Sequence, residues 1–329
     1  MTHSTPLLEP GRRSEAPHPA GGLACRAQDP VLEVEGLRKS YGDLVAVDGV
    51  SFSIERGETF GILGPNGAGK TTTLEIVEGL RAPDSGRITL LGLDAVRMSS
   101  AVQDRIGVQL QSQALWPELT VEETLRTFAA LFRRRAPLER LLARFTLEEK
   151  RRSLVKDLSG GQKQRLSVAV ALVNDPDIVF LDEPTTGLDP QARHNLWDLV
   201  QDIRDEGKTV ILTTHYMEEA ETLCDRVAIM DCGRIEALDT PRNLILNLDF
   251  DSTIECAFAS SVDEDRLLAL PAVRRLIRND GSDILFTSDV SQTLSALSAI
   301  TDARLLNLQV RTATLEDVFI SMTGRKLRP

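Results

Sequence analysis

The segment that most constrains the fold is GPNGAGKT, which occupies residues 64–71 directly after the apolar run Thr59 to Leu63. It matches the pattern GxxxxGK[ST], and a helical pattern begins at Lys70. Glycines let backbone amides turn inward around phosphate groups, and the start of a helix favours their negative charge. A strand, this loop and a helix in that order predict a phosphate-binding loop in an α/β fold.

The loop also supplies a cation and a metal ligand. Lys70 is expected to neutralise the β- and γ-phosphate oxygens, and Thr71 to ligate magnesium. ATP and Mg²⁺ are therefore the predicted ligands. The predicted nucleotide-binding residues of this segment are Gly64, Pro65, Asn66, Gly67, Ala68, Gly69, Lys70, Thr71 and Thr72.

Two acids follow a second apolar run, Ile178 to Leu181. Asp182 and Glu183 are expected at the carboxyl end of a buried strand, where ligands bind in open α/β sheets. We predict that Asp182 holds magnesium through water, and that Glu183 activates or orients the water that attacks the γ-phosphate. Such a pair is more often a solvated loop end, and the phosphate loop is what favours the catalytic interpretation.

The pentapeptide LSGGQ at residues 158–162 precedes a helical run from Lys163 to Val173. Ser159 and the two glycines would therefore open a helix, and such an end binds anions. Taken alone, the segment is more simply a serine N-cap followed by two glycines. Its position between the other two motifs changes that preference.

A phosphate loop, then LSGGQ, then a strand that ends in Asp-Glu is the order of the ABC ATPase family, which the chain resembles over roughly residues 31 to 245. The resemblance implies that two subunits meet head to tail, so that the LSGGQ of each closes the nucleotide of the other. With one intact copy of each motif, a homodimer is favoured, and a heterodimer stays open. The residues predicted to act in trans are Leu158, Ser159, Gly160, Gly161 and Gln162.

The resemblance implies roles for four further residues. Tyr41, in LRKSYGDLVAVDGVSF, matches an aromatic residue that stacks on adenine. Gln111, in RIGVQLQSQALWPELT, matches a glutamine that contacts magnesium and the attacking water and relays nucleotide state to the membrane partner, with Gln109 as competitor. Asp189, in TTGLDP, matches a residue of a loop at the dimer interface. His215, in TVILTTHYMEEA, matches a switch histidine that contacts the γ-phosphate. The simpler alternatives are that Tyr41 is an ordinary edge-strand tyrosine, that Asp189 belongs to an Asp-Pro turn, and that His215 is a structural histidine.

The pattern of strands and helices predicts three parts. Residues 1–30 are rich in Pro and Gly without a hydrophobic period and are predicted to be a flexible tail. Residues 31–247 are predicted to form a P-loop NTPase domain of the ABC ATPase type, with an inserted helical subdomain at about 112–158. In that insert, Thr120 and Glu123 form a capping box before an apolar stripe.

Residues 248–329 are predicted to form a small C-terminal accessory α/β domain with the element order βαβαβα. Its ending, ATLEDVFISMTGRKLR, resembles the tail of ATPases that serve drug, antibiotic and lipid exporters. The expected elements are strand Ser252 to Ala259, helix Glu264 to Ile277, strand Ile284 to Ser288, helix Val290 to Ile300, strand Arg304 to Val310 and helix Thr314 to Thr323.

Composition and charge limit the partners. The net charge of −11 over 329 residues argues against nonspecific nucleic-acid binding, which needs clustered Lys and Arg. No apolar run approaches the roughly 20 residues that cross a bilayer. We expect a cytoplasmic ATPase, peripheral on the inner face of the cell membrane, that drives export of a drug-like, antibiotic or lipid substrate. Its expected partners are a separate integral membrane permease and a second ATPase subunit, and no nucleic acid.

Two other functions compete with transport. A mechanoenzyme that acts on ribosomes or DNA would carry a second ATPase domain or long coiled coils, and the sequence has neither a second phosphate loop nor sustained heptads. A module that binds ATP without turnover would not need the intact Glu183 and His215. Transport is therefore the favoured function.

Overall fold

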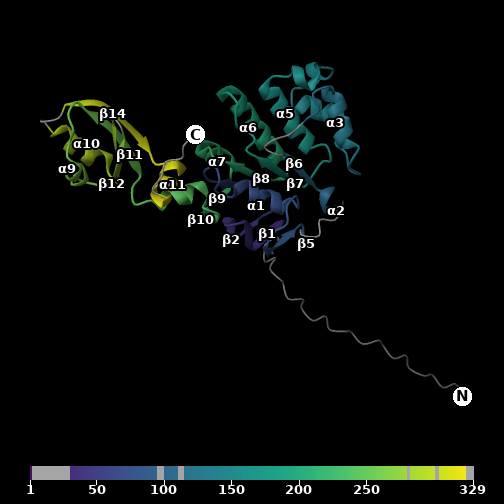
Figure 1. Ribbon diagram of the computed structural model, residues 1–329, viewed down its shortest axis with the longest axis horizontal. Helices are drawn as coiled ribbons and strands as arrows, with labels where there is room; N and C mark the ends of the chain where they lie inside the picture. Colours follow the sequence, from purple (N-terminus) through teal and green to yellow (C-terminus); the bar gives the residue numbers. More distant parts are fainter. Residues whose placement is uncertain (2–29, 95–99, 110–114, 280–281, 301–303, 324–329) are drawn as a thin grey trace.

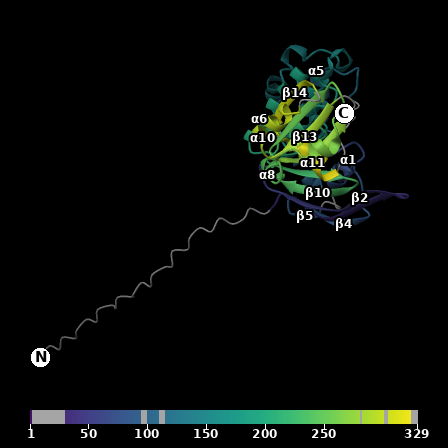
Figure 2. The ribbon, with the colours of Figure 1, turned by 90° about the vertical axis from the view of Figure 1, so that its left-hand side faces the viewer.

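The computed structural model describes residues 30–94, 100–109, 115–279, 282–300 and 304–323, together with Met1. Figure 1 shows a larger α/β body in purple to green, and a smaller unit in green to yellow beside it. The larger body contains a six-stranded and a four-stranded sheet, and the smaller unit has a four-stranded sheet of its own. Figure 2 looks at the molecule from the side of the smaller unit. The predicted α/β class is confirmed.

The six-stranded sheet has the order β10-β9-β3-β8-β7-β6, and all its pairs except β10 with β9 are parallel. Strands β3, β7 and β8 are buried at every position, as expected where helices cover both faces of a parallel sheet. The buried strand predicted before Asp182 and Glu183 is confirmed as β7. The strands are β3 (Thr59–Leu63), β6 (Ile106–Gln109), β7 (Ile178–Asp182), β8 (Thr209–Thr214), β9 (Arg226–Asp231) and β10 (Arg234–Asp239).

A second, antiparallel sheet packs on the first and has the order β2-β1-β4-β5. The rings of Phe52 and Phe60 stack with centroids 5.3 Å apart and join the two sheets. Helix α1 carries buried side chains into the same hydrophobic cluster. The elements are β1 (Leu32–Tyr41), β2 (Leu44–Ile54), β4 (Ser85–Leu90), β5 (Leu93–Asp94), α1 (Lys70–Val77) and α2 (Ser100–Gln103).

A helical layer covers the other side of the six-stranded sheet. The capping box predicted before α3 is confirmed, because Thr120 N donates to Glu123 Oε2 at 2.8 Å and Glu123 N donates to Thr120 Oγ1 at 3.2 Å. The helices are α3 (Val121–Ala129), α4 (Leu138–Arg144), α5 (Gly160–Ala171), α6 (Pro190–Asp205), α7 (Met217–Leu223) and α8 (Pro241–Leu246), with 3₁₀ turns at Glu148–Lys150 and Val155–Asp157.

The smaller unit corrects one part of the sequence prediction. The helix predicted over Glu264 to Ile277 ends at Leu268, and Val273–Asn279 is a strand that pairs with β13. Pro271 cannot continue a helix, and the residues after it form a hairpin with β13. The element order is therefore βαββαβα, not βαβαβα. The elements are β11 (Ser252–Phe258), α9 (Glu264–Leu268), β12 (Val273–Asn279), β13 (Ser282–Thr287), α10 (Val290–Ser298), β14 (Leu305–Thr312) and α11 (Leu315–Thr323).

Helix α11 returns from this unit to the larger body. Its residues Leu315, Val318 and Phe319 belong to the main hydrophobic cluster. The amide of Leu315 donates to Glu221 Oε1 of α7 at 2.7 Å, which satisfies one of the free amides at the start of the helix. Helix α11 thereby anchors the smaller unit to α7, the helix that follows His215.

Candidate nucleotide site

The phosphate loop connects β3 to α1 and lies against two other backbone segments. A Cβ on Gly64 would lie 2.1 Å from Met230 O, and one on Gly69 would lie 2.3 Å from Ala46 O. Gly69 also has a φ of 102°, which other residues rarely adopt. Because α1 has no side-chain N-cap, its first amides remain available to an anion.

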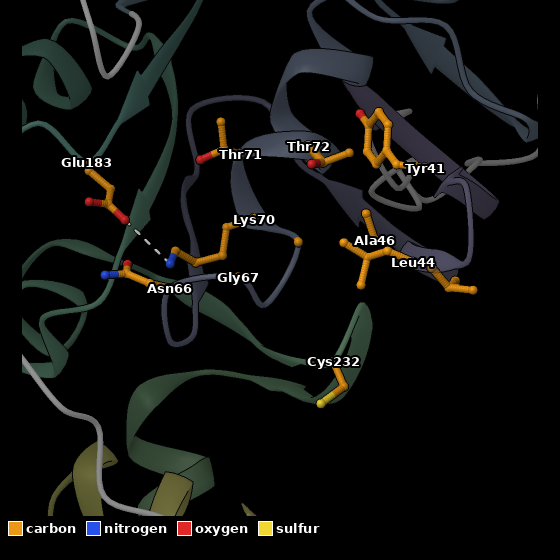
Figure 3. Close-up of a pocket in the computed structure, with 12 residues that line it drawn as sticks. Tyr41, Leu44, Ala46, Asn66, Gly67, Lys70, Thr71, Thr72, Glu183 and Cys232 are labelled. Carbon is orange, nitrogen blue, oxygen red and sulfur yellow. Dashed lines mark ion pairs between the residues drawn. The ribbon is translucent and has the colours of Figure 1, made fainter.

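Lys70 is buried under this loop. Its Nζ donates to the carbonyl oxygens of Gly64 at 2.8 Å and Pro65 at 3.1 Å, and lies 3.4 Å from Glu183 Oε1. Figure 3 shows the two side chains pointing toward each other. Burial lowers the pKa of Lys70, although the acids Glu183 and Asp182 oppose that shift. Phosphate oxygens would be stronger partners for this ammonium than the two carbonyls.

Asp182 lies beside the first turn of α1. Thr71 Oγ1 donates to Asp182 Oδ1 at 3.3 Å, and Thr213 Oγ1 donates to the same oxygen. Burial raises the pKa of Asp182, and the hydrogen bonds from Thr213 and Thr71 oppose the rise. A hydroxyl and a carboxylate are hard oxygen donors of the kind that Mg²⁺ prefers, so these residues fit the ion.

Glu183 occupies the position just past β7, with a φ of 47°. Its Oε2 accepts a hydrogen bond from Thr186 Oγ1 at 3.0 Å and lies 3.4 Å from His215 Nδ1. Burial raises the pKa of Glu183, but Lys70, Thr186 and His215 together outweigh burial and hold it below its ordinary value. The carboxylate is therefore ionised at neutral pH, as a general base must be.

Thr213 connects the two acids, and the sequence analysis missed it. Its hydroxyl donates to Asp182, and the same oxygen accepts a hydrogen bond from Glu183 N at 3.0 Å. The contact arises because β8 lies next to β7, with Thr213 opposite Asp182. The available signal was its place two residues before His215, but the sequence did not reveal which strands are neighbours.

We expect Thr213→Val to lower the rate of ATP hydrolysis by roughly tenfold to a hundredfold, because the loss of a buried hydrogen-bond partner costs about 1–3 kcal/mol. Valine keeps the size and the strand propensity, so the fold should persist. The measurement is kcat and KM for ATP, with Thr209→Val as control, since Thr209 Oγ1 accepts from Gly57 N at the opposite end of the strand. Equal turnover in both variants would remove Thr213 from the site.

A cleft of about 550 Å³ opens beside the loop. In Figure 3, Lys70 and Glu183 lie on one side of it and Tyr41, Leu44 and Ala46 on the other. The volume lies within the usual range for ligand pockets, with an ionic end for phosphates and an aromatic and aliphatic end for a base. The lining residues are Tyr41, Leu44, Val45, Ala46, Asn66, Gly67, Gly69, Lys70, Thr71, Thr72, Glu183 and Cys232. Of these, Leu44, Val45, Ala46 and Cys232 were not predicted.

The LSGGQ residues do not line this cleft. Ser159 caps α5: its amide donates to Gln162 Oε1 at 2.9 Å, and Gln162 N donates to Ser159 Oγ at 3.3 Å. The simpler capping role is therefore present, and it does not exclude the role in trans, because Ser159 and Gly160 are exposed. Both lie where a second molecule can reach them.

The structure places the remaining predicted residues in three different surroundings. Asp189 is exposed and caps α6 by accepting from Ala192 N at 2.9 Å. His215 follows β8 directly and lies beside Glu183. Gln111 lies outside the described residues, whereas its competitor Gln109 ends β6 and is buried.

Comparison with known proteins shows the family. A family model described as ABC transporter matches residues 47–186. Nod factor export ATP-binding protein I of Ralstonia nicotianae is 42% identical over 309 residues, which cover 91% of this chain and 95% of that protein. The chain belongs to the ABC transporter ATP-binding proteins. Another ABC protein of the same name, from Rhizobium leguminosarum bv. viciae, is 40% identical and covers 94% of this chain and 98% of its own length.

Solved ABC structures agree with the fold. The cbiO1 protein from Clostridium perfringens, part of the ABC transporter complex cbiONQ, matches with a TM-score of 0.60 and 31% identity, over 67% of this chain and 92% of that chain. A dimeric bacterial ABC transporter cassette matches with a TM-score of 0.58 and 28% identity, over 64% of this chain and 98% of that chain. This ABC subunit is thus an ATPase. In the part of the chain that the structure describes, none of the helices combines the length and the apolar character of a membrane span.

Proposed function

We propose that this ABC ATPase drives export through a separate membrane permease, on whose cytoplasmic face it sits. The supporting observation is that relatives named for Nod factor export match over 90% or more of the chain, well beyond the 47–186 segment that the family model matches. The similarity therefore extends to the C-terminal unit, whose ending ATLEDVFISMTGRKLR resembles that of exporter ATPases. The proposed cargo is a drug-like, antibiotic or lipid molecule.

The proposed division of the chain follows this function. Residues 1–30 would form a flexible tail, and residues 31–247 the ATPase domain, with the helical subdomain at about 112–158. Residues 248–329 would form a small accessory domain. The sheets and two of the hydrophobic clusters support this division, since the larger body and the smaller unit each have a sheet and a cluster of their own.

The roles proposed for the residues follow from the site geometry. Lys70 and the first amides of α1 bind the β- and γ-phosphates, and Tyr41 packs on the base. Glu183 orients the attacking water and accepts its proton, while His215 holds the γ-phosphate end. Magnesium, when held by Thr71 and Asp182, supplies charge for the phosphate oxygens. Gln111, outside the described residues, stays a proposed contact to magnesium and water.

The proposed dimer completes each site with LSGGQ from the other subunit, and two inactive variants can test it. Ser159→Arg damages only the donated motif, and Glu183→Gln only the receiving site. A mixed dimer then keeps one intact site, so mixing should restore about a quarter of normal hydrolysis if two identical subunits pair at random and their sites act independently. The measurement is phosphate release from the two variants, separately and mixed.

The mixing experiment also has an outcome that would contradict the proposed dimer. If LSGGQ closed the site of its own chain, each mixed dimer would contain only damaged sites, and mixing would restore nothing. Ser159→Arg mixed with Ser159→Arg carrying a different tag is the matched control, since it forms dimers without an intact site.

The transport proposal is tested by identifying the proteins that co-purify with this subunit. Tagged Glu183→Gln, which should hold ATP and a stable dimer, is recovered from detergent-solubilised membranes, and the proteins that accompany it are identified. An integral membrane protein in stoichiometric amount supports export by a separate permease. Recovery of ribosomes or DNA without such a protein would defeat the proposal and favour a mechanoenzyme.

A further inference from the structure

A second cleft of about 550 Å³ lies between α1, β6, α3 and α5, and it shares no lining residue with the nucleotide cleft. Its walls are mostly apolar. Ile106 and Val108 of β6 line one side, and Phe128 with the adjoining Leu131 and Phe132 lines the other. The proposed catalytic residues leave this cleft without a role.

One acid lies in this apolar wall. Glu78, at the end of α1, is only 4% exposed, and neither of its carboxylate oxygens has a hydrogen-bond partner in the described structure. The polar neighbours in the wall are the neutral Gln103 and Asn174. The Asn174 side-chain amide already donates to the carbonyl oxygens of Asp104 and Ile106. A buried carboxyl without a partner opposes folding, so its presence calls for a ligand beyond the described residues.

The electrostatic surroundings of Glu78 fit a cation. Burial raises the pKa of this carboxyl to about 9, and the two charged groups that act on it, Asp182 of β7 and Glu75 of α1, are acids that raise it further. Arg81 pairs with Glu75, but no basic group of the described residues pairs with Glu78 itself. A lysine or arginine entering the cleft would find in this carboxyl a group without a partner among the described residues.

The rim of the cleft fits a protein rather than a small cation. Leu80 is 59% exposed and Leu131 is 74% exposed. Trp116 is 52% exposed and stacks on Phe128 with centroids 5.7 Å apart. Exposed apolar side chains gathered around a cleft mark a protein contact surface. The occupant therefore carries apolar side chains as well as the cation.

The position of the cleft couples it to the nucleotide site. Its wall strand β6 pairs with β7, where Gln109 lies opposite Leu181, the residue before Asp182. Another wall, α5, begins at the LSGGQ segment, and α1 begins at Lys70. A partner seated here touches the helices that begin at two of the motifs and the strand that pairs with the third, so it is placed to respond to ATP.

We infer that Glu78 selects the membrane partner, by accepting a lysine or arginine that the permease inserts into this cleft beside its apolar side chains. The inference rests on the proposed function and adds the residue and the charge by which the permease is recognised. Docking converts the neutral carboxyl to a carboxylate, so it releases one proton to solvent. The affinity should therefore rise with pH by roughly tenfold per unit between pH 7 and 9, because one proton is lost on binding.

The experiment measures binding of the purified full-length chain to membrane vesicles from a strain that lacks the chain but keeps the permease. Protein-free liposomes of the same lipids report nonspecific binding. Glu78→Gln and Glu78→Leu should weaken binding to the vesicles by at least about thirtyfold, since a buried cation then loses its partner, and should abolish the rise with pH. Glu58→Gln is the matched control and should bind like the wild type, because Glu58 is also a buried glutamate but pairs with Arg226 and does not line the cleft.

The stability of the free chain separates a docking role from a structural one. Removing an unpartnered buried acid should leave the melting temperature of Glu78→Leu equal to or above that of the wild type. The advantage should grow between pH 4.5 and 9, since the raised pKa makes the acid increasingly unfavourable to folding over that interval. Basal ATP hydrolysis of the free chain should not change.

Each outcome decides something. If wild type and Glu78→Leu bind the vesicles equally, the role of Glu78 is wrong while the transport proposal stands. If the wild type binds vesicles no better than liposomes, the transport proposal fails and this inference fails with it. A Glu78→Leu chain that melts lower than the wild type would show that the carboxyl is a structural group.

Discussion

Glu183→Gln should lower the rate of ATP hydrolysis by about a thousandfold, because a positioned general base contributes roughly 10²–10⁴-fold. Glutamine has the same shape and can still accept a hydrogen bond from Thr186, but it cannot take a proton from water. ATP binding should persist, since Lys70 and the amides of α1 remain. The measurements are phosphate release and equilibrium binding of ATP to the same preparation.

Glu58→Gln is the matched control for this substitution. Glu58 is also a buried glutamate, but it lies at the opposite end of β3 and pairs with Arg226. Its substitution should leave turnover near normal. Brisk hydrolysis by Glu183→Gln would assign the base to another residue, and loss of ATP binding would show that Glu183 acts through Lys70, which it contacts at 3.4 Å.

Lys70→Met should weaken ATP binding and lower hydrolysis by roughly a hundredfold to a thousandfold, the effect of removing one preorganised group that stabilises developing charge. Methionine occupies a similar volume under the loop, so the carbonyls of Gly64 and Pro65 stay covered. Lys70 also helps to hold the pKa of Glu183 below its ordinary value. Without the ammonium, burial should raise that pKa, so less of Glu183 is ionised as pH falls.

The measurement for Lys70→Met is ATP affinity together with hydrolysis as a function of pH. The acidic limb of the pH profile should move to higher pH if residual activity persists. Lys39→Met is the control, since Lys39 pairs with the exposed Asp84 rather than with the loop. Normal affinity in Lys70→Met would contradict the assignment of this lysine to the phosphates.

Local sequence predicted much of the site, because each motif has a physical signature within a few residues. The loop before Lys70, the serine that opens α5 and the two acids at the carboxyl end of β7 were all placed on the correct elements. The helix predicted over Glu264 to Ile277 shows where such signatures fail. There, pairing of β12 with β13 decided the structure, and the helical pattern that continued past Pro271 did not.

The sequence by itself determined which chemical groups the chain offers: a lysine on a glycine loop, two acids after a buried strand and a helix opened by Ser159. Only the tertiary structure decided which of them meet. Thr71 reaches Asp182 across 111 positions of the chain, and Thr213 reaches the same acid across 31. These contacts depend on strand order, and no local pattern encodes strand order. The burial of Glu78 is likewise a tertiary property, because it arises where α1 packs beside β6 and α5.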